Sequence, residues 1–353
     1  MVGMSGGIDS TVVAYLLKQK GYDVIGVTML LWSQRSNLTG KASKGNFCFS
    51  ADKSQDIDRI QQLCSMIGIE HHVLNLSRNF EDVVLRNFKD EYLDGRTPNP
   101  CVWCNPTIKF GAMWDELESQ GITFDAFATG HYARIEYENG RYCLKRGIDD
   151  LKDQSYFLYR LGQRQLSKIL FPLGGMHKDD VRKIDVAQGF HPEAQQESQD
   201  FYDGDYADLL GVGDQQGDIV DEDGHKLGTH HGIFHYTLGQ RRGLGISSKE
   251  PLYVIALDPA HNQVIVGNEA STYSTAVMAD HVVWGSQLDF STEGLQAKIR
   301  STGKPVNVSA EKISDDQIRA TFTAPVKAAT PGQSLVIYQG DTVVAGGIIS
   351  SVG

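Results

Sequence analysis

A short glycine-containing loop near the start of the chain most constrains what it can fold into. Residues 5–10 read Ser-Gly-Gly-Ile-Asp-Ser, after an apolar lead-in over residues 2–4 and before an apolar run over residues 11–17. Glycines let a backbone bend tightly and approach a ligand, while the unpaired N–H groups and dipole of a following helix favour negative charge. Asp9 and Ser10 would also serve as helix caps, which is the simpler alternative. The pattern predicts a strand, a phosphate-sized loop and a helix N-terminus.

The loop differs from a Walker nucleotide site, because it lacks the GxxxxGK[ST] spacing and has no lysine. It resembles the SGGxDS PP-loop of ATP pyrophosphatases, which cleave ATP to AMP and pyrophosphate in order to adenylate a substrate. The resemblance implies that residues 5–10 hold pyrophosphate. It leaves the substrate undetermined.

Apolar, β-branched runs alternate with helical patterns after this loop. We expect strands at residues 24–30, 72–76 and 124–129, and helices at residues 52–67 and 79–93. This alternation predicts an α/β fold with a doubly wound parallel sheet. Ligands of such sheets bind beyond the carboxyl ends of the strands, which makes Met29, Gly130 and His131 candidates for the adenosine side of a site. Core packing is the alternative for Met29, and a hydrogen-bonded structural role is the alternative for His131.

Charge and turn patterns divide the rest of the chain. Residues 152–189 hold seven Lys or Arg and four Asp, a net charge of +3, whereas residues 193–223 hold eleven acidic residues and no Lys or Arg. We expect a hairpin at 133–146, short strands at 232–245, 252–257 and 263–267, and a compact β-barrel from about residue 271. The expected domains are a catalytic domain at 1–203, a small central module at 204–270 and a β-barrel at 271–353.

A second informative stretch spans residues 97–106 and carries Cys101 and Cys104 in a CxxC spacing. Its first prolines predict an extended loop, while Asn105 and Pro106 suit a helix start. We therefore expect Cys104 just before a helix N-terminus, whose dipole stabilises a thiolate. A lone CxxC fits a redox pair, half of a metal or iron–sulfur site, or a sulfur carrier with a partner thiol; inert packing is the remaining reading.

Composition limits the class of protein. The 353 residues are 41% hydrophobic, and a net charge of −11 with a pI of about 5.4 argues against a uniformly basic nucleic-acid surface. Five cysteines are an odd set, which argues against a disulfide framework. No apolar run approaches the ~20 residues that span a bilayer, and no leader pattern precedes the first strand. We expect a cytoplasmic protein without membrane contact.

Taken together, the motifs resemble the family of tRNA-specific 2-thiouridylases (MnmA/TrmU), over essentially the whole chain. The motifs that carry the resemblance are SGGIDS at 5–10, TPNPCVWCN at 97–105, ATGHYAR at 128–134, KDQSYFL at 152–158, ESQD at 197–200 and YTLGQRRGLG at 236–245. The resemblance implies that ATP, with Mg²⁺, adenylates the C2 oxygen of uridine 34 at the wobble position of tRNA. Sulfur then displaces AMP to leave 2-thiouridine. The implied partners are tRNA and a sulfur-donor protein.

The resemblance also assigns residues. The candidate catalytic residues are Cys104 as the nucleophile, Cys101 and Asp9. The implied ATP-binding residues are Gly3, Met4, Ser5, Gly6, Gly7, Ile8, Asp9, Ser10, Met29 and Gly130. The implied tRNA-binding residues are Asn99, Pro100 and Cys101 at the target base, with His131, Lys152, Asp153, Gln154, Arg300, Ser301 and Gln333 elsewhere. The sequence singles out no set of metal-ligating residues for the magnesium.

One departure from the family pattern bears on the chemistry. Many members have an aspartate at the place of Cys101 and a second catalytic cysteine where this chain has Tyr202. Tyrosine cannot carry sulfane sulfur, so we hypothesise that Cys101 and Cys104 act as the carrier and the resolving thiol. A second hypothesis is that the CxxC and one further ligand, such as Cys48, hold an iron–sulfur cluster that delivers sulfide.

Two other functions stay open on sequence alone: another PP-loop tRNA-modifying ligase, and a tRNA-binding protein that has lost thiolation. Contacts to tRNA phosphates are expected from local basic patches, namely residues 152–183, Arg241 with Arg242, and Lys298, Arg300 and Lys304. The wobble base must leave its stack to reach a buried site. Trp103 and Tyr132 are either stacking surfaces for it or core residues.

Overall fold

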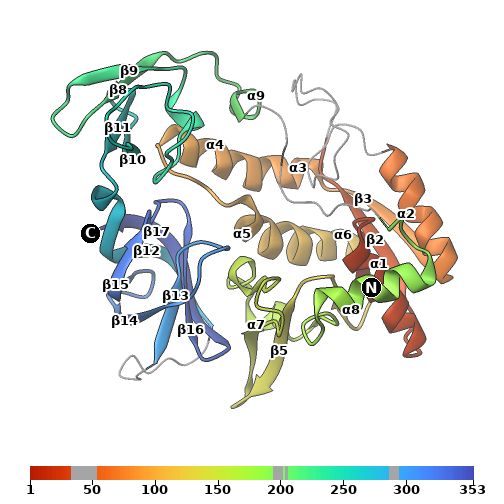
Figure 1. Ribbon diagram of the computed structural model, residues 1–353. Helices are drawn as coiled ribbons and strands as arrows, with labels where there is room; N and C mark the ends of the chain where they lie inside the picture. Colours follow the sequence, from red (N-terminus) through yellow and green to blue (C-terminus); the bar gives the residue numbers. More distant parts are fainter. Residues whose placement is uncertain (33–53, 194–201, 203–205, 286–293) are drawn as a thin grey trace. The chain divides into compact units, whose positions relative to one another are not determined.

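The computed structural model describes residues 1–32, 54–193, 202, 206–285 and 294–353 (Figure 1). Cys48 and the ESQD motif at 197–200 lie outside the described residues. The chain divides into two compact units. The first unit comprises Met1–Val84, Cys101–Gly204 and Asp341–Val343, and the second comprises Leu85–Pro100, Asp205–Gly340 and Val344–Gly353.

The first unit is built on a five-stranded parallel sheet in the order β3-β2-β1-β4-β7. Its strands are β1 (Val2–Gly3), β2 (Ile25–Leu30), β3 (Glu70–Asn75), β4 (Phe127–Ala128) and β7 (Ile169–Leu170). The chain moves from β1 outward through β2 to β3, and then returns to place β4 on the other side of β1. The strand order therefore reverses between β1 and β4, which is where open α/β sheets bind ligands.

Helices of the first unit cover both faces of this sheet, which confirms the predicted doubly wound α/β fold. The helical segments are α1 (Ile8–Gln19), α2 (Ser54–Ile67), α3 (Ser77–Phe80), η1 (Glu81–Leu85), α5 (Pro100–Cys104), η2 (Asn105–Ala112), α6 (Met113–Ser119), η3 (Ser155–Phe157), α7 (Gln163–Leu166) and α8 (Lys178–Gln188). Neighbouring strand residues point to opposite faces. Ala128 of β4 packs in the core with Val12 of α1 and Val181 of α8, whereas Phe127 contacts Phe110 and Trp114 from the helix on the other face.

The predicted hairpin at 133–146 is present as β5 (Ala133–Glu138) and β6 (Arg141–Arg146). Asn139 and Gly140 both have positive φ, 50° and 81°, as a type I′ turn requires. The helix predicted at 79–93 runs through α3, η1 and α4 (Arg86–Leu93), the last of these in the second unit.

The second unit contains a four-stranded sheet and a closed barrel. The sheet has the order β10-β11-β8-β9, from β8 (Gly217–Val220), β9 (Lys226–His230), β10 (Tyr253–Asp258) and β11 (Gln263–Gly267). The barrel strands are β12 (Tyr273–Trp284), β13 (Leu295–Lys298), β14 (Val306–Lys312), β15 (Ile318–Lys327), β16 (Ser334–Gln339) and β17 (Thr342–Val352), and pairing of β12 with β17 closes the ring. Short helices α9 (Tyr206–Leu210), η4 (Ile233–His235) and η5 (Ala270–Thr272) connect these strands. The barrel confirms the sequence prediction.

The strand predicted at 232–245 is wrong. This segment forms η4 followed by turns, and four of its glycines take positive φ, at Gly232, Gly239, Gly243 and Gly245. A β-ladder of extended residues does not contain such conformations. The several glycines of this segment favour turns, and this preference outweighs the preference of its apolar residues for a strand.

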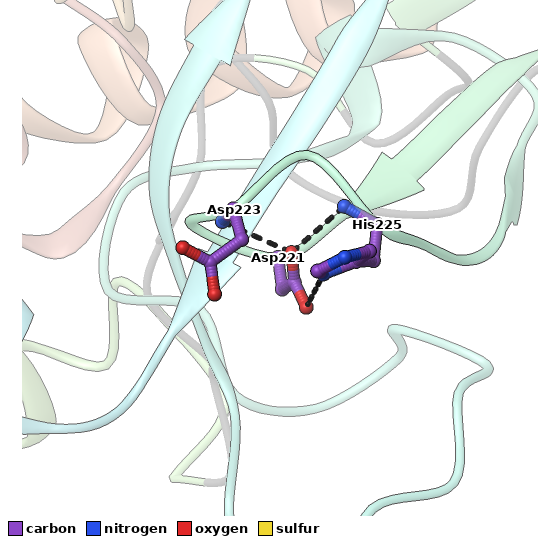
Figure 2. Close-up of side chains that lie close together, drawn as sticks. All are labelled: Asp221, Asp223 and His225. Carbon is purple, nitrogen blue, oxygen red and sulfur yellow. Dashed lines mark hydrogen bonds and ion pairs between the residues drawn. The ribbon is translucent and has the colours of Figure 1, made fainter.

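The acidic run ends in a turn between β8 and β9, where Asp221, Asp223 and His225 lie close together (Figure 2). The Asp221 carboxylate accepts hydrogen bonds from the backbone N–H groups of Asp223 (3.0 Å) and His225 (2.8 Å) and contacts the His225 ring at 3.2 Å. The His225 N–H bond contributes most to lowering the pKa of Asp221. This carboxylate therefore closes a hairpin turn. Among the described residues, no helix has the length and apolarity to cross a membrane.

Candidate functional site

The glycine-containing loop connects β1 to α1 in the first unit, as the sequence predicts. Gly6 has φ +79°, and a Cβ there would lie 2.9 Å from Ile60 of α2, so conformation and space both require glycine. The carbonyl of Gly7 accepts hydrogen bonds from the hydroxyls of Ser10 (3.1 Å) and Thr11 (2.9 Å). Neither Asp9 nor Ser10 caps the helix by side chain, since Gly7 is the N-cap residue. Among the described residues no side chain caps the start of α1, which makes its first N–H groups candidates for binding a ligand.

Gly130 lies directly against this loop, at the switch point between β1 and β4. A Cβ at position 130 would lie 2.7 Å from the Asp9 Cβ and 3.0 Å from the Ser10 backbone nitrogen. Met29 is half-buried near the carboxyl end of β2, the neighbour of β1 on the other side. The structure thereby brings the loop and Gly130 into contact and places Met29 at the same edge of the sheet.

Asp9 is the centre of a polar network that the sequence did not reveal. Its Oδ1 accepts hydrogen bonds from Lys178 Nζ at 2.7 Å and from the Tyr132 hydroxyl at 2.8 Å. Tyr132 is bound in turn to Gln154, through Tyr132 N to Gln154 Oε1 (3.0 Å) and Gln154 N to Tyr132 O (2.9 Å). Hydrogen bonds therefore lead from Gln154, in the KDQ motif at residues 152–154, through Tyr132 to Asp9 in the glycine-containing loop.

Lys178 corrects part of the predicted tRNA surface. The sequence places it in the basic region 152–183, but its side chain is only 9% exposed and is paired with Asp9. One signal marks it in the sequence: Lys178 is the first residue of α8, where a cation opposes the helix dipole and acids are preferred. Tyr132, expected as a stacking surface or a core residue, is a core residue with 2% exposure.

His131 follows Gly130 and has a neutral ring. Its Nδ1 lies 2.7 Å from the Thr129 hydroxyl, and its ring contacts Phe110 and Phe171. Burial, and then the charge of Lys109, lowers the pKa of His131 well below its ordinary value. At neutral pH this side chain offers hydrogen bonds and a ring face, with no positive charge.

The two cysteines of the CxxC motif lie within a helix, and the prediction of a helix start after Cys104 is wrong. The helix begins at Pro100 and continues through α5, η2 and α6 to Ser119. Cys101 is therefore in its first turn, and Cys104 lies one turn further along in helical conformation (φ −60°, ψ −43°). Cys104, which we expected just before a helix N-terminus, is inside the helix, and Cys101 is the cysteine nearest its N-terminus.

Pro106 explains why this helix was misread. Proline lacks an N–H group and its ring crowds the preceding turn, so it is read as a helix start rather than an interior residue. Here residues 105–112 form a wider π-helical segment, with Phe110 at φ −109° and ψ 19°. The wider turn gives the proline ring room.

Residues after the KDQ motif hold this helix. Asn105, which is buried, donates a hydrogen bond to the Phe157 carbonyl (3.0 Å), and Gln165 donates to the carbonyls of Pro106 and Phe110, both at 2.8 Å. Trp103 lies between the two cysteines in sequence. The Arg160 guanidinium is 4.1 Å from the centre of its ring, which is a cation–π contact. Trp103 is half-buried.

The thiols of the described cysteines differ in accessibility. Cys101 is exposed and Cys104 half-buried, whereas Cys64 and Cys143 are buried. Burial raises the pKa of Cys64 to about 11 and also raises that of Cys143. A neutral thiol is a poor nucleophile. Among the described cysteines, thiol chemistry therefore falls to Cys101 and Cys104.

The KDQ motif has strong internal contacts. Asp153 is buried and accepts hydrogen bonds from the N–H groups of Gly147 and Ser155 (both 3.1 Å), the Ser155 hydroxyl (3.0 Å) and Arg146 Nε (3.4 Å). Lys152, beside it, is half-buried. These bonds fix the loop that leads to Phe157 and Gln165, which hold the CxxC helix.

Within the second unit, two predicted tRNA-binding residues hold loops in place. Gln333 donates to the carbonyls of Thr97 (2.9 Å) and Pro98 (3.4 Å), next to Asn99 and Pro100. Arg300 donates to the carbonyls of Leu238 (3.1 Å) and Ala328 (2.8 Å) and to the Thr330 hydroxyl (3.1 Å). Ser301 follows in a half-exposed turn, and in the predicted basic patch Lys298 is buried while Lys304 is exposed.

Tyr202, the residue at the place of the second family cysteine, is 7% exposed. A phenol at this position supplies no sulfur. If this chain carries sulfur on a second cysteine, as many family members do at this position, that cysteine must lie elsewhere in the chain.

Three family models match the chain. They are described as the tRNA methyl transferase HUP domain (residues 1–202), the tRNA methyl transferase PRC-barrel domain (210–268) and the aminomethyltransferase beta-barrel domain (274–349). One solved structure, the U34-tRNA thiolase NcsA from Methanococcus maripaludis with its [4Fe-4S] cluster, aligns at 21% identity and a TM-score of 0.33, covering 60% of this chain and 61% of that one. A likeness this weak supports no argument about function.

Curated relatives are similar over their whole length. The tRNA-specific 2-thiouridylase MnmA of Endomicrobium trichonymphae is 41% identical, over 99% of this chain and 98% of that protein. The tRNA-specific 2-thiouridylase MnmA 1 of Caldanaerobacter subterraneus subsp. tengcongensis and the MnmA of Clostridioides difficile are each 42% identical, over 99% of this chain and 97% of theirs. With the glycine-containing loop, the thiol pair and this identity along its whole length, the chain belongs to the family of tRNA-specific 2-thiouridylases.

Proposed function

We propose that this protein is an ATP-dependent tRNA-uridine 2-sulfurtransferase that thiolates uridine 34. The observation that carries the proposal is the position of the CxxC helix relative to the ATP loop. Gly130 contacts the first turn of α1, the next residue, His131, contacts Phe110, and Phe110 belongs to the helix that carries Cys101 and Cys104. An anion site and a reactive thiol pair thus belong to one connected set of residues in the first unit.

The first step is adenylation of the base. Residues Gly3 to Ser10, Met29 and Gly130 bind ATP, with the N–H groups at the start of α1 directed to its phosphates. The C2 oxygen of uracil attacks the α-phosphorus, and pyrophosphate leaves. Magnesium is brought by the phosphates of ATP, since it is usually held by phosphate oxygens with few protein ligands. Adenylation is needed because the C2 oxygen alone is a poor leaving group.

The second step transfers sulfur through the two thiols of one helix. Exposed Cys101 receives sulfur from a donor protein as a persulfide, whose terminal sulfur attacks C2 and expels AMP. The adduct joins Cys101 to C2 of the base through two sulfur atoms. Cys104 then attacks Cys101 Sγ and breaks the S–S bond of this adduct. 2-Thiouridine leaves, and a Cys101–Cys104 disulfide forms. An external thiol reductant restores both thiols. On a helix, residues three apart have Cα atoms about 5 Å from each other, within the range of about 4.4–6.8 Å that a disulfide spans.

An iron–sulfur cluster is the alternative source of sulfide. Cys101 and Cys104 offer two thiolate ligands on one helix face, and the other two described cysteines are buried elsewhere in the first unit. The described residues therefore supply two of the four thiolates that a complete site holds. The relay accounts for the described cysteines without a further ligand, and iron content decides between the two mechanisms.

Contacts to tRNA are proposed for residues on both units. Asn99, Pro100 and Cys101 are the target-base residues, and the others are His131, Lys152, Asp153, Gln154, Arg300, Ser301 and Gln333. Because Asp153, Arg300 and Gln333 have internal partners, their proposed role includes holding the loops that meet the RNA. The neutral His131 ring suits contact with a base rather than with a phosphate.

The proposal is tested by thiolation of tRNA in vitro with ATP, magnesium and a small-molecule persulfide, such as cysteine persulfide, as the sulfur donor, reading product nucleosides by mass spectrometry. Cys101→Ser and Cys104→Ser are each expected to abolish 2-thiouridine. Cys64→Ser is the matched control, because that thiol is buried and protonated, and its activity is expected to stay near that of the parent.

Other outcomes separate the alternatives. Loss only in Cys104→Ser would place the carrier thiol elsewhere. Iron and a brown chromophore after anaerobic purification would favour the cluster. An absence of 2-thiouridine with the parent, together with no tRNA-dependent release of AMP, would support a tRNA-binding protein that has lost the activity.

A further inference from the structure

A buried histidine–aspartate pair contacts the ATP loop from the interior of the first unit. His191 Nε2 lies 3.0 Å from the Gly6 carbonyl oxygen, and His191 Nδ1 lies 2.6 Å from Asp185 Oδ1. The exposed fractions of the two side chains are 0% for His191 and 2% for Asp185. None of the sequence motifs includes either residue.

The local structure brings His191 to this place. Helix α8 ends at Gly189, which takes the left-handed conformation (φ 67°) and reverses the chain. Phe190 then packs edge-on against Tyr15 of α1, with ring centres 5.6 Å apart. His191 is thereby directed back to Asp185 in the last turn of α8 and to the loop before α1.

The chemistry of the partners fixes the proton on one ring nitrogen. A carbonyl oxygen only accepts hydrogen bonds, so His191 Nε2 must carry a hydrogen and donate it to Gly6. A second proton lies between Nδ1 and Asp185, on the ring as imidazolium with carboxylate or on the acid as imidazole with carboxylic acid, and in either form Asp185 orients the ring while Nε2 keeps its hydrogen. Buried and without solvent competition, this pair holds the Gly6 carbonyl in one direction.

The direction of that carbonyl determines the direction of the next N–H group. In a trans peptide the C=O and N–H bonds lie in one plane and point in opposite directions. A Gly6 carbonyl held toward the buried His191 turns the Gly7 N–H away from the interior. The Gly7 carbonyl is held in the same way by Ser10 and Thr11, which orients the N–H of Ile8. Both N–H groups lie at the N-terminus of α1, where helix donors lack helical partners.

We infer that His191 and Asp185 are positioning residues for ATP: they hold the Gly6–Gly7 peptide so that its N–H faces the phosphates before ATP binds. This deepens the proposed function and rests on it. The loop then loses its conformational entropy during folding rather than when ATP binds, which increases the affinity for ATP.

The test measures pyrophosphate release and ATP binding with the full chain and its tRNA. His191→Phe keeps a ring but removes both hydrogen bonds, and His191→Met, which also has no hydrogen-bond donor, is a second variant in case the first fails to fold. Both are expected to raise KM and Kd for ATP by about tenfold, the effect of losing about one well-placed hydrogen bond. The Kd for tRNA is expected to stay at the parent value.

Two further variants distinguish positioning from packing. Asp185→Asn still offers the ring a hydrogen-bond partner and keeps Nε2 as the donor, so it is expected to bind ATP within about threefold of the parent. Phe190→Leu is the matched control, since it removes the neighbouring contact with Tyr15 but leaves the bond to Gly6. It is expected to lower the melting temperature without changing the KM for ATP.

An unchanged KM for ATP in both His191 variants would overturn the inference. So would an equal rise in KM in Phe190→Leu, because packing would then be the cause. A parent that neither binds ATP nor forms 2-thiouridine would instead overturn the proposed function, and the inference with it.

Discussion

Gly130 is the residue at which the smallest change has the most specific expected effect. In Gly130→Ala the new methyl group would lie 2.7 Å from the Asp9 Cβ and 3.0 Å from the backbone of Asp9 and Ser10, so the loop or β4 must move. We expect the KM for ATP to rise at least about tenfold, with about 1–3 kcal/mol lost from the free energy of unfolding. Pyrophosphate-release kinetics and urea unfolding measure the two quantities.

Gly175→Ala is the control for this substitution, because a Cβ at position 175 meets no atom within 4 Å. It is expected to match the parent in both measurements. A Gly130→Ala protein with the parent's KM would show that ATP does not use this edge of the sheet.

At the same scale, the sequence predicted some site residues and missed others. The residues of the loop, Gly130 and the two cysteines follow from local motifs. Lys178 does not, because its partner Asp9 is 169 residues away and no local pattern encodes the pairing. His191 was missed for the same reason, since its contact with Gly6 spans 185 residues.

Among the elements, the helix from Pro100 to Ser119 yields a direct test of accessibility. Cys101 is exposed and Cys104 half-buried, while Cys64 and Cys143 are buried and have raised pKa values. In a Cys48→Ser background at pH 8, we expect iodoacetamide to modify Cys101 first, Cys104 next, and the buried pair only after unfolding. Peptide mass spectrometry over a time course reads the order. Early labelling of Cys64 would contradict the described core.

The same helix shows why element boundaries were harder to predict than elements. Pro106 has the features of a first helical residue, yet a π-helical turn accommodates it in the interior. Prolines and glycines are local signals, and the tertiary contacts of Asn105 and Gln165 decide how they are used. The parallel sheet, the hairpin and the barrel were predicted because alternating apolar patterns reflect burial over many residues.

For the molecule as a whole, histidines with lowered pKa values, one buried and two half-buried, predict sensitivity to acid. Burial, the largest cause, lowers the pKa values of His71, His131 and His230 in the folded state. The unfolded chain therefore binds more protons below its pKa of about 6.5, so stability is complete above that pH and falls as the pH decreases. Each such histidine contributes up to about 1.4 kcal/mol per pH unit.

We expect His131→Gln to reduce this slope between pH 6.5 and 5.5, by up to about 1.4 kcal/mol relative to the parent. His177→Gln, at an exposed position (62%), should leave it unchanged. Urea unfolding at each pH gives the free energies. Equal slopes in all three proteins would mean that His131 is protonated as readily in the folded state as in the unfolded one.

The overall charge of −11 predicts that tRNA is bound through local basic patches and not by the general field. Arg241 and Arg242 are exposed in the second unit. If both contact phosphates, Arg241→Ala with Arg242→Ala should reduce the slope of log affinity against log salt by about 1.8, at roughly 0.9 for each contact.

Lys178→Met is the comparison, because that ammonium is paired internally with Asp9. Its slope for tRNA, measured without ATP, should equal that of the parent. A reduced slope in Lys178→Met would mean that Lys178 reaches the RNA.

The meeting of Gly130 with Asp9 also links nucleotide binding to assembly of the sheet. The loop after β1 and the residue after β4 are far apart in sequence, and they form one binding edge only when β4 pairs with β1. The unfolded chain has no such edge, so ATP bound at the proposed site would bind the native state alone. By mass action, ATP at a hundred times its dissociation constant adds about 2.7 kcal/mol to the free energy of unfolding. Under the proposed function, the nucleotide substrate would therefore also be a ligand that selects the folded form of the protein.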